Sequence, residues 1–249
     1  LIVGWAFTSG YAIFAGTVLW RMSGSNEWEL EFERNGVKVW SLKEPGAYNK
    51  QYRAVMQGDF TLNQLVAGLI ENSTPEMCKQ NIPGCMAVQV IEPWSNETMT
   101  DTVLWKLELP EPFLPRESLI RSHVHQDPKT KTVTVDVMAA PNSAPRNPGT
   151  IRLTQFQNRW RYTPVGKGKV EVEFIQNIDM GGMFPDFLLN LGGAEETYKF
   201  LHDQLPDEPI CIAAPLHVLQ RKRLPFEAPH RAYWTLSHSR PCITMVVLP

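Results

Sequence analysis

The sequence predicts an α+β fold in which a curved antiparallel sheet wraps around one long C-terminal helix. Segments in which apolar and polar residues alternate follow one another through the middle of the chain, and turn residues separate them. One amphipathic stretch at residues 185–205 comes after the last of these segments. With 249 residues, 43% of them hydrophobic, the chain can build a sizeable core in one large domain or two small ones.

The first elements expected are a hairpin, a strand and a helix. Residues 28–40 predict two strands that meet at Asn35-Gly36, because Asn-Gly readily takes the positive φ values of a tight turn. Residues 52–57 predict a third strand. Asp59 stands at the N-cap of a helix that Pro75 ends. The apolar residues of that helix share one face, and they are Leu62, Leu65, Val66, Leu69 and Ile70.

Three segments in the middle of the chain alternate like strands with one buried face. Turns are expected between strands at residues 127–128, 147–149 and 166–168. Because no helical pattern separates the segments, they predict an antiparallel meander and not a series of βαβ units. The apolar positions are Val103, Trp105, Leu107 and Leu109, then Val133, Val135 and Val137, then Val170, Val172 and Phe174.

The final helix is expected to begin at Pro185, whose fixed φ suits a first helical position. Gly192-Gly193 in its middle lowers helix stability, so this helix is expected to open for a ligand. Prolines interrupt any pattern from Pro206 on, which predicts an irregular tail over residues 206–249. The apolar stripe of the helix, at spacings of three and four, is Phe184, Phe187, Leu188, Leu191, Ala194, Tyr198, Leu201 and Leu205.

Three motifs occur in order along the chain. They are Pro115-Arg116-Glu117-Ser118-Leu119-Ile120-Arg121, Gly149-Thr150-Ile151-Arg152, and Asp179-Met180-Gly181-Gly182-Met183-Phe184-Pro185. Together they resemble the START family, the lipid-transfer domains related to the steroidogenic acute regulatory protein, in a bacterial-type form. Glu117 replaces the commoner Asp, and the resemblance extends from about Trp28 to Leu205. It implies a helix-grip fold over residues 22–205 whose apolar cavity binds a single lipid or other hydrophobic molecule, for transfer or sensing.

The resemblance also implies which residues bind the ligand. Arg121 takes the position of the family's cavity-facing arginine, whose guanidinium would bind the polar head of a lipid. Alternation places His123 on the same face, and Ile120 and Ser122 on the other. An acid partner for Arg121 would come from Asp101 or Asp136; alternatively, Arg121 only caps the rim or pairs with a surface acid. The expected ligand-binding residues are Arg121, His123, Trp105, Val135, Phe174, Phe187, Leu188 and Leu191.

Catalysis receives little support from the sequence. The chain has no nucleophile elbow, P-loop or dinucleotide fingerprint, so no catalytic residue is assigned. The alternative is an enzyme resembling polyketide cyclases and aromatases on the same fold, with Arg121, His123 and Tyr162 acting on an enolate. His123 and His125 share a strand face but lack a third ligand, so neither a metal nor another cofactor is expected.

Charge and cysteine content bear on partners and compartment. A net charge of −2 gives no reason to expect a nucleic-acid partner. The partners that the resemblance implies are a lipid or other hydrophobic ligand and a membrane surface for loading and release. Residues 1–20 carry no charge and approach the length that crosses a bilayer, so residues 1–21 are expected to be a signal or membrane anchor. The domain is then periplasmic or membrane-anchored, with a cytoplasmic location as the alternative. Cys78 and Cys85 would form a disulfide in an oxidising compartment and otherwise remain thiols.

Overall fold

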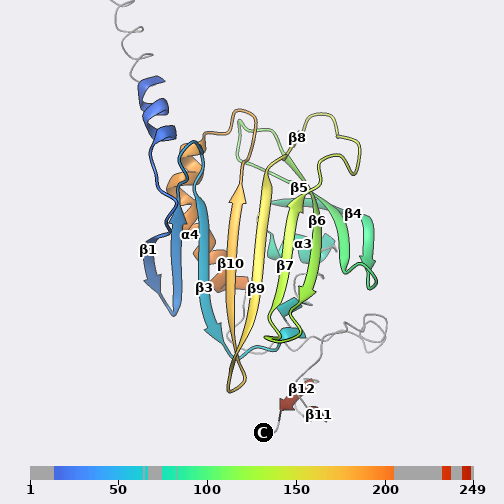
Figure 1. Cartoon of the computed structure of the whole chain (residues 1–249). Coiled ribbons are helices and arrows are strands. Elements are labelled where there is room, and N and C mark those ends of the chain that lie inside the picture. The colour runs from blue at the N-terminus through green and yellow to red at the C-terminus, as the bar shows by residue number, and fades with distance from the viewer. Residues whose placement is uncertain are drawn as a thin grey trace, which may run out of the picture.

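The structure is a computed structural model, and it describes residues 14–63, 65–66, 75–82, 84–204, 232–236 and 243–247. A ten-stranded sheet curves over two helices, α3 and α4, which lie on the same face of it (Figure 1). The helices are α3 (Pro75–Asn81) and α4 (Asp186–Gln204). The strands are β1 (Glu29–Arg34), β2 (Val37–Leu42), β3 (Gln51–Gly58), β4 (Cys85–Ser95), β5 (Thr100–Leu107), β6 (Arg116–Gln126), β7 (Val133–Ala139), β8 (Ile151–Arg152), β9 (Phe156–Gly166) and β10 (Lys169–Ile178).

The strands pair in the order β1-β2-β3-β10-β9-β7-β6-β5-β4, and β8 pairs with β6. Every pair along this path is antiparallel, whereas β8 runs parallel to β6. The chain crosses from β3 to the far edge at β4, and the meander then returns until β10 pairs with β3. The sheet stays open, with β1 and β4 at its edges. The predicted α+β helix-grip architecture and antiparallel meander are confirmed.

The predicted turns are also confirmed. Asn35 and Gly36 have φ values of 49° and 75°, as a tight two-residue hairpin turn requires. The tip of this hairpin packs on α4, because the side-chain amide of Asn35 donates to the Tyr198 hydroxyl at 2.8 Å. Positive φ recurs in the β9–β10 turn, at Gly166, Lys167 and Gly168.

The segment between β3 and β5 differs from the sequence prediction. Leu65 donates its amide to the Thr61 carbonyl, and helical residues begin at position 62, so Thr61 and not Asp59 precedes the helix. Pro75 begins α3, because proline is tolerated in a first helical turn. The end of the earlier helix lies outside the described residues. Positions 69 and 70 lie outside the described residues.

The sequence prediction also missed β4, which forms the second edge of the sheet. Its pairing with β5 shifts register three times, between Cys85 and Ala87, Val90 and Glu92, and Glu92 and Ser95. Each shift breaks the period-two alternation from which strands are recognised in a sequence. A disulfide joins Cys78 in α3 to Cys85 at the start of β4, which ties the short helix to this edge.

The inward face of α4 differs from the predicted stripe. Ala194, Tyr198 and Leu201 pack on the core as expected, but Phe187 and Leu191 are 64% and 81% exposed. In the first half of the helix the sheet comes too close for large side chains. An added Cβ at Gly193 would lie 2.2 Å from the Tyr52 ring.

Small and polar residues take the inward places on α4 instead. The Asn190 side-chain oxygen accepts the Lys50 amide at 2.8 Å, and Thr197 is fully buried. The Tyr52 hydroxyl donates toward the carbonyls of Leu189 and Asn190. The helix is therefore held to β3 by hydrogen bonds at one end and by apolar packing at the other.

The two ends of the chain are described only in part. Residues 14–22 are helical, and Trp20 and Arg21 donate to the carbonyls of Tyr48 and Gly46. Among the described residues, none of the helices has the length and apolar character to cross a bilayer; residues 1–13 of the expected anchor lie outside them. In the tail, β11 (Ala232–Leu236) and β12 (Ile243–Val247) pair antiparallel. These ten residues are regular where an irregular tail was expected, because neither segment contains a proline.

Candidate functional site: an internal cavity

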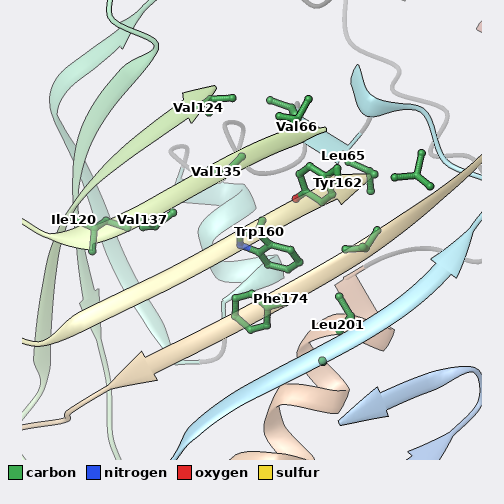
Figure 2. Packing of buried hydrophobic residues seen from close by; sticks show 14 of the residues in the cluster. Leu65, Val66, Ile120, Val124, Val135, Val137, Trp160, Tyr162, Phe174 and Leu201 are labelled. Carbon is green, nitrogen blue, oxygen red and sulfur yellow. The ribbon is translucent and has the colours of Figure 1, made fainter. Parts of the chain in front are cut away.

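A cavity of about 210 Å³ lies between the inner face of the sheet and the helical residues beneath it. Strands β5, β6, β7, β9 and β10 form its wall, and Val66 and Phe200 close it from the helical side. Figure 2 shows Ile120, Val124, Val135 and Val137 on neighbouring strands, projecting from the same side of the sheet. The lining residues are Val66, Ile82, Asp101, Val103, Trp105, Leu107, Ile120, Ser122, Val124, Val135, Val137, Phe156, Asn158, Trp160, Gln176, Ile178 and Phe200.

Strand register arranges the cavity wall in rows that cross the sheet. One apolar row pairs Val124 with Val135 and Val135 with Trp160. Trp160 then stacks on Phe174, with ring centroids 4.3 Å apart, and closes that side with aromatic packing. On the other side of the wall, Val103 pairs with Ile120. The predicted inward faces of β5, β7 and β10 are thus confirmed.

A row of polar side chains lies between these apolar rows. We call Asp101, Ser122, Asn158 and Gln176 the polar row. Register joins Asp101 to Ser122 and Asn158 to Gln176, and Val137 stands between the two pairs. All four side chains line the cavity.

Two buried atoms of the wall lack a hydrogen-bond partner among the described residues. They are the Asn158 side-chain oxygen and the Trp105 indole nitrogen. Asn158 is only 9% exposed. Leaving a buried polar atom unsatisfied costs about 1–3 kcal/mol, so a ligand that pairs with these atoms recovers that cost.

Two of the eight residues expected to bind ligand line the cavity. Trp105 and Val135 contribute to its wall. Phe174 is fully buried and faces inward, but it fills the core against Trp160 and Phe200 instead of lining the cavity. The alternation of β5, β7 and β10 was a sufficient signal for the inward direction of all three residues. It did not indicate which of them border empty space.

The expected cavity positions of Arg121 and His123 are wrong. Ile120, Ser122 and Val124 take the cavity face of β6, so Arg121 and His123 project from the outer face. The Arg121 side chain is 50% exposed and pairs with Glu92 on β4. Its Nε also donates to the Thr102 hydroxyl at 3.2 Å. The strand itself was predicted correctly, but the face expected to line the cavity is the face that points to solvent.

The two acids that were candidate partners of Arg121 lie on opposite faces of the sheet. Asp101 lines the cavity, whereas Asp136 lies on the outer face and pairs with Arg159 at 2.6 Å. Phe187, Leu188 and Leu191 are exposed and border no part of the cavity wall, contrary to expectation. The polar lining residues that sequence reasoning missed are Ser122, Asn158 and Gln176, whose residue types carry no functional signature on their own.

Three charged residues of the motifs that carry the family resemblance are absent from the cavity lining and fix loops instead. We call Arg116, Glu117 and Arg152 the motif cluster. The fully buried Arg116 guanidinium donates to the carbonyls of Leu114, Met180 and Gly181. Burial lowers the pKa of this guanidinium. Gly181 and Gly182 both have positive φ, so the turn that presents these carbonyls favours glycine.

Glu117 and Arg152 form a fully buried ion pair at 2.7 Å. The parallel pairing of β8 with β6 sets the two residues side by side. Arg152 also donates to the carbonyls of Pro141, Ala144 and Pro145, and so holds the loop before β8. Burial acts to raise the pKa of the Glu117 carboxyl, but hydrogen bonds from Asn147 and Arg152 and the arginine charge outweigh it, so that pKa is lowered.

The three residues that the enzyme alternative requires do not lie together. Arg121 and His123 lie on the outer face of the sheet, whereas Tyr162 is fully buried on its inner face. Burial raises the pKa of Tyr162 well above its usual value. His123 and His125 stack with centroids 5.6 Å apart, and no group of three or more candidate metal ligands occurs in the described part of the chain.

An open antiparallel sheet wrapped around a final helix, with an apolar cavity between them, defines a helix-grip domain. Three solved structures share this architecture. The STAR-related lipid transfer protein of Xanthomonas axonopodis matches with a TM-score of 0.63 and 19% identity, over 71% of this chain and 96% of that one. Human STARD10 matches with a TM-score of 0.60 and 14% identity, over 80% of this chain and 78% of that one. Human StAR-related lipid transfer protein 5 matches with a TM-score of 0.55 and 15% identity, over 81% of this chain and 95% of that one.

The chain therefore has the helix-grip fold of the START lipid-transfer domains. At these identities the likeness establishes the fold alone. No family model matches the sequence. An uncharacterized protein of Pseudomonas aeruginosa is 27% identical over 168 residues, which cover 67% of this chain and 79% of that relative.

Proposed function

We propose that this chain binds one lipid or other hydrophobic small molecule in the cavity and carries or senses it without transforming it. The observation that supports this is the cavity itself, an apolar space of about 210 Å³ crossed by the polar row. Apolar walls with a few convergent polar groups are the usual form of a small-ligand site. The volume lies below the roughly 300–1,000 Å³ of ordinary ligand pockets. It therefore favours a single acyl chain or a compact molecule.

An exposed apolar surface supports loading and release at a membrane. We call Leu114, Met183, Phe187 and Leu191 the apolar patch. Met183 is 91% exposed, and the other three are also largely exposed. The 110–115 loop meets the chain before α4 at the Phe113–Phe184 ring pair, with centroids 5.0 Å apart, so the patch belongs to one end of the molecule. Exposed apolar side chains gathered in this way mark interaction surfaces.

Mass spectrometry of the organic extract of purified protein tests the binding proposal. Val137→Trp is expected to abolish the co-purified hydrophobic molecule, because residue 137 lines the cavity. Met138→Trp is the matched control, since residue 138 is the next residue of β7 and is exposed. Ligand that is retained in Val137→Trp, or absent from all three proteins and not taken up from vesicles, would contradict the proposal.

Vesicle co-sedimentation tests the apolar patch. Phe187→Ser with Leu191→Ser is expected to reduce sedimentation with phosphatidylcholine vesicles and to slow ligand uptake. Leu30→Ser removes a similarly exposed leucine from β1 and is expected to change neither. Equal sedimentation of wild type and the double variant would remove the patch from the proposal.

We further propose that the domain works in an oxidising compartment, exported or anchored by residues 1–21. The Cys78–Cys85 disulfide and the uncharged residues 1–20 support this location. Thiol counting on unreduced protein from its native host tests it. Linked Cys78 and Cys85 peptides are expected, and free thiols at both positions would instead favour the cytoplasmic alternative.

A further inference from the structure

We infer that the ligand carries a hydrogen-bond donor, a hydroxyl or an amine, at the polar row, and that the cavity rejects carboxylates and phosphates. This inference rests on the proposed function and specifies the ligand's polar group. It comes from the chemistry of four side chains that strand register sets side by side.

The first step is that the polar row consists mainly of acceptors. Asp101 presents a carboxylate, and the Asn158 side-chain oxygen is buried without a partner among the described residues. Ser122 can donate or accept. A ligand oxygen or nitrogen that bears hydrogen matches these atoms, whereas an acceptor-only group does not.

The second step concerns the orientation of Gln176. Its side-chain nitrogen donates to the Thr197 hydroxyl, and that hydroxyl donates to the Gly193 carbonyl. A hydroxyl has one hydrogen, so a hydroxyl that donates to Gly193 must accept from Gln176. These two hydrogen bonds fix the orientation of the Gln176 side-chain amide. Its carbonyl oxygen therefore remains a further acceptor in the polar row. The helix α4 thus sets the polarity of the row.

The third step is electrostatic. The described part of the cavity wall includes no lysine, arginine or histidine. The nearby guanidinium of Arg121 lies on the outer face and pairs with Glu92. An anionic head would therefore enter an apolar cavity beside Asp101 with no cation from the described part of the wall to balance its charge, which disfavours the charged form. The Trp105 indole offers a neutral donor and does not balance a full charge.

The fourth step concerns position. Apolar rows flank the polar row on both sides, through Val124 and Val135 on one and Val103 and Ile120 on the other. A ligand that places its donor at the row therefore extends hydrocarbon along the wall. Single-chain alcohols and amines meet this description and suit the small volume.

Isothermal titration calorimetry with three probes of equal chain length tests the inference. Decan-1-ol, decylammonium and decanoate differ only in the head. We expect decan-1-ol and decylammonium to bind wild-type protein at least tenfold more tightly than decanoate. Decanoate binding as tight as that of decan-1-ol would overturn the inference and leave the proposed function standing. Binding of none of the three probes would count against both.

Two variants locate the discrimination. Asp101→Asn keeps the side-chain shape and is expected to reduce the preference for decylammonium over decanoate by at least tenfold. Asp136→Asn removes a carboxylate from the outer face and is expected to leave that preference unchanged. An unchanged preference in Asp101→Asn, in protein whose circular dichroism matches wild type, would overturn the role of Asp101.

Discussion

The motif cluster and the polar row are both sets of polar side chains turned toward the interior, yet they differ in how completely they are paired. Arg116 and Arg152 each donate to three backbone carbonyls, and Arg152 also pairs with the buried Glu117. The polar row leaves the Asn158 oxygen without a partner among the described residues. Complete pairing characterises polar groups that hold a fold, whereas an unpaired group in a cavity wall is available to a ligand.

This difference explains where the recognisable sequence signal lies. Among the residues that resemble a known family, Arg116, Glu117 and Arg152 fix the loops around β8 and the turn before α4. The cavity wall uses serine, asparagine and glutamine on strands, and such residue types carry no signature. Replacing members of the two groups should therefore affect stability and binding in opposite ways.

The largest effect is expected from breaking the motif cluster. Arg152→Met leaves Glu117 buried without its partner and frees the loop carbonyls that Arg152 binds. Removing one partner of a buried ion pair costs about 3–5 kcal/mol. Urea unfolding of the variant should show that loss. A loss below about 1 kcal/mol would mean that the pair contributes no more than an exposed one.

Acid should weaken the motif cluster through the same ion pair. The pKa of Glu117 is lowered in the folded protein, so its carboxylate stabilises the fold at neutral pH. That contribution is fully present above the unfolded pKa of about 4.3 and is lost as pH falls through the lower folded value. The free energy of unfolding should decrease from pH 6 to pH 3 more steeply in wild type than in Glu117→Gln. Equal slopes would show that other carboxylates carry the acid response.

Adjacent glycines of α4 provide the next comparison. Gly193→Ala places a methyl against the Tyr52 ring, at 2.2 Å from the unrelaxed ring carbon, and overpacking of this kind costs about 1–3 kcal/mol. A Cβ added at Gly192 would meet no side chain or backbone of another described segment within 4 Å, so Gly192→Ala should gain up to about 1 kcal/mol of helix stability. Thermal unfolding of both variants measures the difference. The sequence alone predicted that both glycines lower helix stability, whereas the structure predicts opposite effects for the two substitutions.

The same helix shows how far the sequence determines the structure. Period-two alternation and the Asn35-Gly36 turn predicted the sheet and its topology class, because those signals are local. The inward face of α4 was not predictable, since it depends on how closely Tyr52 approaches Gly193. The face of β6 was misjudged for a related reason. Leu119 and Ile120 are both fully buried, so apolar residues stand on both sides of the strand and alternation alone does not select one.

The polar row should respond in the opposite direction to the motif cluster. Asn158→Leu removes a buried acceptor that has no partner among the described residues and adds apolar volume at the cavity. We expect the ligand-free protein to gain about 1 kcal/mol in urea unfolding, because an unsatisfied group is costly to bury. The variant should at the same time bind decan-1-ol more weakly. Lower stability together with unchanged binding would place Asn158 with the structural residues.

The smallest effect is expected at Arg121, the residue that the family resemblance made the leading candidate for binding. Its side chain is half exposed, and its partner Glu92 is equally so. Exposed ion pairs are screened by solvent and contribute little. Arg121→Met should therefore leave both the unfolding midpoint and decan-1-ol affinity within experimental error of wild type. Since Arg152→Met makes the same replacement in the motif cluster, the pair of variants separates burial from charge. A clear loss of ligand affinity in Arg121→Met would require the outer face of β6 to take part in binding, and the cavity would then not be the whole site.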